Sequence, residues 1–148
     1  MSRPHVLGWL VLLSIPGPAL AGDWPQFRGV NGSSISPSKK VPVEFSHKDK
    51  VKWVVPVAEG LSCPIIVSGK IYLTSMTPAK KFAVDAYDAA TGTVLWHKEF
   101  DPGKLPRITP PNSHASATAA SDGKRVYVHM STIGLIALDA NDGAEVWR

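Results

Sequence analysis

The pattern Ala-x-Asp-x-x-x-Gly-x-x-x-Trp occurs twice in this chain, with an offset of 51 residues. Matched positions at identical spacing, with a period of about 50 residues, are typical of repeat architectures, in which each unit buries its hydrophobic faces against its neighbours. The second copy ends one residue before the last, so we expect further units, either in the same polypeptide or in another chain. The motif residues are Ala86, Asp88, Gly92 and Trp96 in the first copy and Ala137, Asp139, Gly143 and Trp147 in the second.

The first 21 residues have the pattern of an export signal. Arg3 and His5 precede an apolar stretch at 6–15, a Pro-Gly-Pro sequence then breaks any helix, and Ala-Leu-Ala supplies small residues for cleavage. The apolar stretch is too short to span a bilayer, which takes about 20 residues. We therefore predict cleavage after Ala21, export to the periplasm or the cell exterior, and no membrane span.

Charge and cysteine content limit the remaining function classes. The chain carries 16 basic and 12 acidic side chains, and its longest basic runs are the pairs at 39–40 and 80–81. Nucleic-acid binding needs a clustered basic surface, so we predict no nucleic-acid partner. Cys63 is the single cysteine. Stability must therefore come from packing rather than disulfides, and we expect Cys63 to be buried as a small hydrophobic residue.

Turn-forming residues dominate 22–50, and we expect an irregular segment whose Trp24 and Phe27 pack onto the main body. From residue 51 to 148, short β-branched or alternating runs are separated by turns roughly every 8 to 12 residues, which predicts an all-β domain. Aligning the repeats predicts four strands in each unit. They are 62–67, 70–74, 82–89 and 94–100 in the first unit, and 115–120, 125–131, 135–140 and 144–148 in the second.

Four antiparallel strands per repeated unit form the blade of a β-propeller. The small residues at 115–120 suit the crowded innermost strand, and a tryptophan in the fourth strand can cover the backbone of the next blade. Residues 51–58, with Trp53, have the pattern of a fourth strand without its three predecessors. The predicted fold is a partial β-propeller of about two four-stranded antiparallel blades plus an orphan outer strand.

The repeated motif resembles the tryptophan-docking motif of the pyrroloquinoline-quinone (PQQ) type of propeller repeat. Asp23-Trp24-Pro25-Gln26-Phe27-Arg28-Gly29 is similar to the mature N-terminus of exported bacterial proteins of this class, and residues 112–118 and 122–128 are similar to one of their early blades. The resemblance covers about 22–148. It implies the fold, with the tryptophan docking between blades and the glycine permitting a tight turn.

The resemblance leaves two functions open. Members that use PQQ are dehydrogenases with a calcium ion, a catalytic aspartate and often two adjacent cysteines. This chain has no Cys-Cys, and its 139–143 stretch departs from the EF-hand pattern and is expected to be a hairpin turn. PQQ and calcium therefore belong only to the alternative hypothesis, the N-terminal part of a quinoprotein dehydrogenase. We favour a protein that is not an enzyme.

The favoured function is a non-catalytic scaffold, similar to the propeller component of the outer-membrane protein assembly machinery. The longest connection between strands, at 97–114, is expected to cross one face of the propeller, where loops commonly carry binding function. We predict Arg107, Asn112 and His114 as candidate binding residues of this loop face. The expected partner is a protein or an extracellular polymer, without a cofactor or metal.

Overall fold

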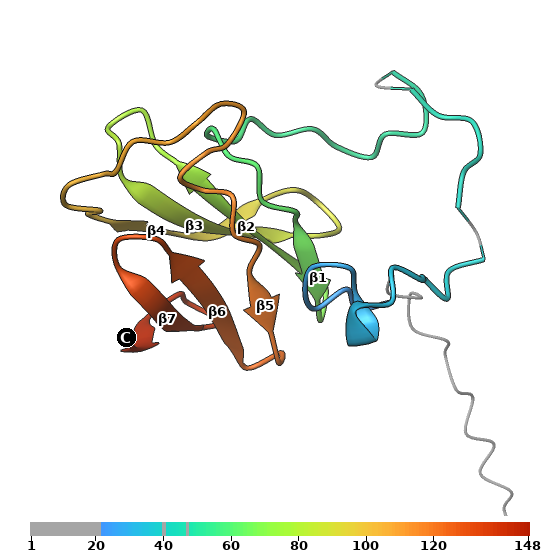
Figure 1. The fold of residues 1–148 in the computed structure, drawn as a ribbon. Coiled ribbons are helices and arrows are strands. Elements are labelled where there is room, and N and C mark those ends of the chain that lie inside the picture. The colour runs from blue at the N-terminus through green and yellow to red at the C-terminus, as the bar shows by residue number, and fades with distance from the viewer. Residues whose placement is uncertain (1–21, 40, 47) are drawn as a thin grey trace, which may run out of the picture.

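Two four-stranded antiparallel sheets make up the body of the protein (Figure 1). The computed structural model describes residues 22–148 except 40 and 47, so the expected export signal lies outside the described residues. The first sheet contains β1 (Ile65–Val67), β2 (Lys70–Met76), β3 (Phe82–Asp88) and β4 (Val94–Phe100). The second contains β5 (Ala120–Ser121), β6 (Arg125–Met130), β7 (Gly134–Asp139) and β8 (Glu145–Trp147). The prediction of two four-stranded antiparallel units is confirmed.

Tight hairpins set the strand order within each sheet. Ser68 and Gly69, between β1 and β2, have φ values of 51° and 75°. Positive φ at both central residues gives a turn whose twist matches that of the flanking strands. Each strand therefore pairs with the next one along the chain, in the order β1-β2-β3-β4 and β5-β6-β7-β8.

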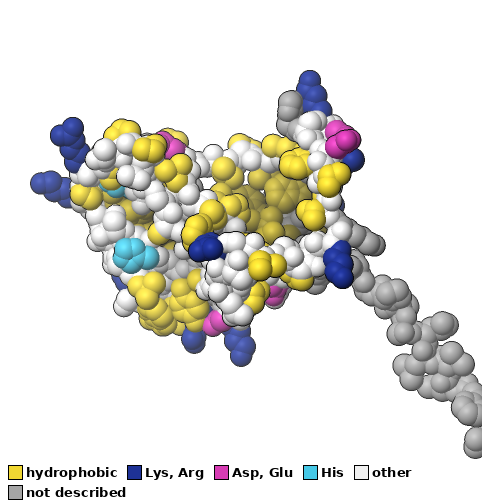
Figure 2. Space-filling view, turned by 45° about the vertical axis from the view of Figure 1, so that its right-hand side comes forward, with side chains coloured by type: hydrophobic (Ala, Val, Ile, Leu, Met, Phe, Trp, Pro, Cys, Tyr) yellow, Lys and Arg dark blue, Asp and Glu magenta, His cyan; other side chains and the backbone are white. Residues whose placement is uncertain are grey.

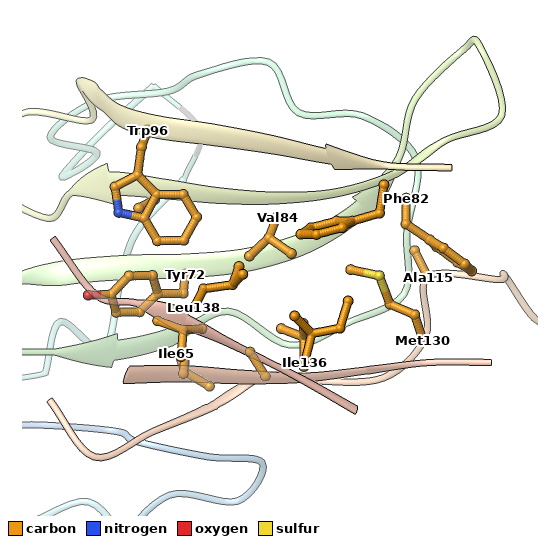
Figure 3. Packing of buried hydrophobic residues seen from close by; sticks show 14 of the residues in the cluster. Ile65, Tyr72, Phe82, Val84, Trp96, Ala115, Met130, Ile136 and Leu138 are labelled. Carbon is orange, nitrogen blue, oxygen red and sulfur yellow. The ribbon is translucent and has the colours of Figure 1, made fainter. Parts of the chain in front are cut away.

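The hydrophobic core lies between the two sheets (Figure 3). Alternate residues of β3, including Phe82 and Val84, point from the first sheet toward Ile136 and Leu138 of β7. These four side chains are at most 1% exposed. Because burial of apolar area contributes about 25 cal/mol per Å², the facing side chains of the two sheets stabilise them as a single body.

The innermost strand of the second sheet is shorter than predicted. Strand pairing with β6 covers residues 120–121, whereas the sequence predicted a strand over 115–120. The carbonyl of Ala115 accepts a hydrogen bond from the Leu61 amide at 3.0 Å, and the carbonyl of Ala117 accepts one from Thr74 Oγ1 at 2.8 Å. Thr118 Oγ1 accepts another from the Cys63 amide. Contacts with the first unit thus hold this segment away from β6.

The predicted orphan strand at 51–58 does not form. These residues belong to no strand, because none of the residues that the structure describes pairs with their backbone, and the adjacent bridge joins Glu59 to Met76. Residues 41–58 leave apolar side chains in solvent: Val54 is 78% exposed, and Val43 and Phe45, which precede the predicted strand, are 96% and 72% exposed. Figure 2 shows hydrophobic side chains around a hollow between this segment and the sheets.

The N-terminal segment joins the inner edges of both sheets. The backbone of Trp24 exchanges two hydrogen bonds with Ile66 of the first unit, and the carbonyl of Pro25 accepts one from Ser121 of the second. Trp24 is half-buried and its ring lies against Gly29 of the same segment, so its packing onto the body stays a prediction. Phe27 is 59% exposed, so the prediction that Phe27 packs onto the body is wrong. The segment is anchored to the sheets through its backbone hydrogen bonds.

Cys63 is exposed, contrary to the prediction of a buried thiol. It precedes β1 in the segment that is tied to Thr118 through its backbone amide, so the side chain is free to point outward. Within the described residues, no helix is long and apolar enough to cross a membrane.

Candidate functional site

Trp96 links the two sheets through its ring and its N–H. Its indole lies over Gly143, where a Cβ atom would come within 2.7 Å of the ring. Its Nε1 donates to the carbonyl oxygen of Ala140 at 3.3 Å, and the Tyr72 hydroxyl donates to the same oxygen at 3.1 Å. Burial, with a smaller effect of the Asp139 carboxylate, raises the pKa of Tyr72 to about 12, so the hydroxyl keeps its proton near neutral pH. Lys70 Nζ also donates to this oxygen at 3.1 Å, so three side-chain donors hold the turn after β7.

Trp53 makes the same contact with the first unit. Its Nε1 donates to the carbonyl oxygen of Ala89 at 3.2 Å, and its ring lies 2.7 Å from the position that a Cβ atom of Gly92 would take. The strand expected around Trp53 is absent, yet the ring occupies the place that a preceding unit would supply. At both motif glycines, Gly92 and Gly143, the backbone therefore lies directly against the face of an indole ring.

The motif aspartates shape the turns that follow β3 and β7. Asp88 Oδ1 accepts hydrogen bonds from the amides of Ala90 and Thr91 and from the Thr91 hydroxyl. Hydrogen bonds from Thr91 are the main reason that the pKa of Asp88 lies below its usual value. Asp139 Oδ1 likewise accepts from the Asn141 amide at 2.7 Å. Both carboxylates bind their own backbone.

The motif alanines lie beneath the aromatic pairs. Ala86 pairs with Trp96 across β3 and β4, and Ala137 pairs with Trp147 across β7 and β8; both alanines are fully buried. The rings of Tyr72 and Trp96 form an aromatic pair in the first unit, with centroids 5.8 Å apart, and Tyr127 and Trp147 form the corresponding pair in the second, at 6.1 Å. Trp147 is 41% exposed.

The predicted loop-face residues are not brought together. His114 lines a cavity of about 240 Å³, whereas Arg107 and Asn112 are exposed and lie outside the lining. The cavity lies where the 115–118 segment is held away from β6, and its lining combines hydroxyls, imidazoles and apolar groups. Its lining residues are Pro106, Ile108, Ser113, His114, Ser116, Ala117, His129 and Ser131. A binding role for Arg107, Asn112 and His114 stays a prediction.

A row of polar side chains crosses the first sheet on the face turned away from the second. Asp85, which is 7% exposed, accepts a hydrogen bond from Ser75 Oγ at 3.3 Å and lies 2.6 Å from Nδ1 of His97. The row continues to Glu99, which pairs with Lys81 at 3.0 Å. The hydrogen bond to Asp85 is the main cause that raises the pKa of His97 above its usual value.

Sequence reasoning missed the pair of Asp85 and His97. The two residues face each other across β3 and β4, on the same register as Ala86 and Trp96. Centring the hairpin on the Thr91-Gly92 turn would have placed Lys98 opposite Asp85, because antiparallel partners lie symmetrically about their turn. The register shifts between Ala86 and Tyr87, so the turn alone does not predict the pair.

The residues of the 139–143 turn do not fit a calcium ion. Asn141 Oδ1 accepts from Lys70 Nζ at 2.8 Å, and Asp142 Oδ1 accepts from the Ala144 amide at 2.8 Å. Calcium takes six to eight oxygen ligands, and here an ammonium group and backbone amides hold the oxygens. Across the described part of the chain, no three His, Cys, Asp or Glu residues are grouped so that they could hold a metal. The 139–143 turn is therefore held as a hairpin turn by its own hydrogen bonds.

Comparisons with known proteins agree with the repeat architecture. Residues 46–148 match the family described as outer membrane protein assembly factor BamB. The chain is also similar to the dehydrogenase subunit of the quinone-type alcohol dehydrogenase of Gluconobacter oxydans (strain 621H), with 33% identity over 135 residues. This match covers 85% of the chain, and the chain spans 17% of that relative's length.

Proposed function

The chain belongs to the PQQ-like repeat family described as outer membrane protein assembly factor BamB, and we propose that it is a non-catalytic scaffold that binds a protein or an extracellular polymer on its loop face. The use of the motif's polar groups carries this proposal. Trp53 and Trp96 donate to backbone carbonyls, and Asp88 accepts from backbone amides. The indole groups hold segments together and the aspartate shapes its own turn, which leaves the connecting loops as the surface for partners.

The cavity beside His114 suits a binding surface of this kind. The imidazoles of His114 and His129 and the hydroxyl of Ser131 offer hydrogen bonds, and Pro106 and Ile108 offer apolar contact. Binding sites commonly combine a mainly apolar wall with a few polar groups that fix orientation. We place the protein in the periplasm or outside the cell, with cleavage after Ala21, on the basis of the pattern of its first 21 residues.

The alternative is the N-terminal part of a PQQ-dependent dehydrogenase. The similarity to the Gluconobacter subunit favours it. The described residues hold no group of three or more potential metal ligands, so under this alternative the calcium-PQQ site would have to be built by other residues.

The test uses protein recovered from the periplasm of an expressing bacterium, whose intact mass should correspond to a chain that starts at Gly22. Tryptophan fluorescence should not change when PQQ and calcium are added together, and saturable quenching would favour the dehydrogenase. Cosedimentation with a bacterial envelope fraction should be at least tenfold weaker for the His114→Ala, Ser131→Ala double variant. His97→Ala, which lies outside the cavity, should bind like the unmodified protein. Equal binding by all three would count against a loop-face site.

A further inference from the structure

We propose that protonation of His97 holds the 51–61 segment on the first sheet, and that the segment loosens when His97 loses its proton in alkaline solution. The device has three parts: the buried carboxylate of Asp85, the imidazole that neutralises it, and the segment attached to the sheet on either side of this pair. It concerns neither the cavity beside His114 nor the core between the sheets, so it goes beyond the scaffold function.

Asp85 is a carboxylate among buried, uncharged neighbours. Residues alternate between faces along β3, so Ala83, Asp85 and Tyr87 share the face turned away from the second sheet, and they are 0%, 7% and 6% exposed. Ser75, opposite Ala83 on β2, is 1% exposed. Burial, with a smaller effect of the Asp85 carboxylate, raises the pKa of Tyr87, so the charge acts within this buried layer. An ionised carboxylate in such surroundings needs a compensating charge and hydrogen bonds.

Two side chains compensate the charge of Asp85. Ser75 Oγ donates to Oδ2 at 3.3 Å, and His97 Nδ1 lies 2.6 Å from Oδ1. The distance from His97 Nε2 to Glu99 Oε1 is longer, at 3.5 Å, and Glu99 is already paired with Lys81 at 3.0 Å. Within the described residues, His97 is therefore the cation that pairs with Asp85. A neutral imidazole could keep the hydrogen bond but would leave the buried charge uncompensated.

The 51–61 segment is attached to the first sheet near both ends of β3, with Asp85 between the two attachments. Near one end the ring of Trp53 lies over Gly92, in the turn after β3. Near the other end the Met76 amide donates to the carbonyl of Glu59 at 2.6 Å. The segment forms no strand, so the sheet holds it mainly at these two points. Lifting it would admit water to the buried carboxylate, which would then need no imidazolium beside it.

The segment carries two charged side chains of its own, Lys52 and Glu59. The positive charge of Lys52 acts on Asp88, where it contributes to the lowered pKa of that carboxyl group. Glu59 is exposed. Neither side chain therefore takes over the role of His97 beside Asp85.

The direction of the pH effect follows from the pKa of His97. The hydrogen bond to Asp85 is the main cause that raises this pKa above its ordinary value of 6.5 in the folded chain. Protonation of His97 therefore stabilises the closed segment fully below about pH 6.5, and this stabilisation is lost as the pH rises through the higher pKa of the folded chain. Local opening of the segment returns Asp85 to water without unfolding the core, so it should be the first response to alkaline solution.

The test is hydrogen exchange of the purified chain at about pH 5.5 and about pH 8, expressed as protection factors that correct for faster intrinsic exchange at higher pH. The Met76 amide should lose protection about threefold or more at the higher pH. The Leu61 amide, which donates to the Ala115 carbonyl at the end of the segment, should lose protection with it. The Gly143 amide, which donates to Asp139 in the second sheet, should stay protected.

Two variants remove the charge pair from opposite sides. His97→Gln should give low protection of the Met76 amide at both pH values, because no cation faces the carboxylate. Asp85→Asn should make this protection independent of pH, because no carboxylate is buried. His129→Gln is the matched control, since His129 is an exposed strand residue of the second sheet. It should lose protection at the higher pH as the unmodified chain does.

Equal protection of the Met76 amide at both pH values in the unmodified chain would overturn the proposal. A fall in His97→Gln as large as in the unmodified chain would overturn it too. So would an equal fall at the Gly143 amide, because pH would then act on the whole fold rather than on the segment.

Discussion

At Gly143 the backbone has a φ of +70°, and the ring of Trp96 lies where a Cβ atom would be. Two separate penalties therefore act on any larger residue: strain from the left-handed backbone and overlap with the indole. Gly103 separates them, because its φ is +61° and no atom lies within 4 Å of the Cβ position. Comparing the same substitution at Gly143 and at Gly103 therefore separates the energy of the contact with Trp96 from the backbone strain.

We expect Gly103→Ala to lower the free energy of unfolding by about 1 kcal/mol, from backbone strain alone. Gly143→Ala should cost a further 1–3 kcal/mol or so, because the added methyl group displaces Trp96 from its contact. Urea unfolding followed by tryptophan fluorescence measures both values. Equal losses in the two variants would show that the contact between Trp96 and Gly143 contributes little to stability.

Among the elements, the 115–118 segment could pair with β6 of its own sheet or bond to the first unit, and it bonds to the first unit. Its composition suits the inner strand of its own sheet, but its carbonyls accept hydrogen bonds from Leu61 and Thr74 of the first unit. Thr74 is 5% exposed, so its hydroxyl has little access to water as an alternative partner. The segment therefore joins the two units at their inner ends and leaves a cavity next to β6.

Thr74→Val keeps the shape of the side chain and removes the donor to Ala117. The loss of about 1 kcal/mol per hydrogen bond should accelerate hydrogen exchange at the Leu61 and Cys63 amides, which bond the same segment, about fivefold. Thr93→Val, at an exposed position in the turn before β4, should leave both amides unchanged. Exchange that stays slow in Thr74→Val would mean that other contacts hold the segment.

For the whole molecule, the strands bounded by turn motifs in the sequence could be predicted. The segments whose conformation depends on contacts with residues far along the chain could not. The motif spacing and the turns at Thr91-Gly92 and Asp122-Gly123 predict the two sheets and their order. The strand at 51–58 was wrong because a strand needs a neighbouring strand, and the described part of the chain supplies none for this backbone. The strand at 115–120 was too long because the first unit competes for its carbonyls.

The candidate site, likewise, could be predicted only in part from the sequence. His114 was singled out by its place in a long connection, and it lines a cavity, but Arg107 and Asn112 lie outside that lining. Two companions of His114 in the cavity are His129, from β6, and Ser131, which follows this strand. Only the detachment of the preceding segment brings them together with His114. No pattern of neighbouring residues in the sequence carries that information.

The core between the sheets implies that the two units unfold as one body. Ile136 of β7 is fully buried in the cluster that also contains Phe82 and Val84 of β3. Ile136→Ala should lower the free energy of unfolding by about 2–5 kcal/mol, through lost burial and the cavity left behind. Because the core is shared, hydrogen exchange in β3 should accelerate as much as in β7.

Leu135→Ala is the matched control for this prediction, since Leu135 is next along the same strand and 50% exposed. It should change stability by less than about 0.5 kcal/mol, as is usual for surface positions. If Ile136→Ala accelerated exchange in β6 and β7 but left β3 protected, the sheets would be independent units. Equal acceleration would establish that one cooperative core holds both sheets, so that a change in one unit alters the stability of the other.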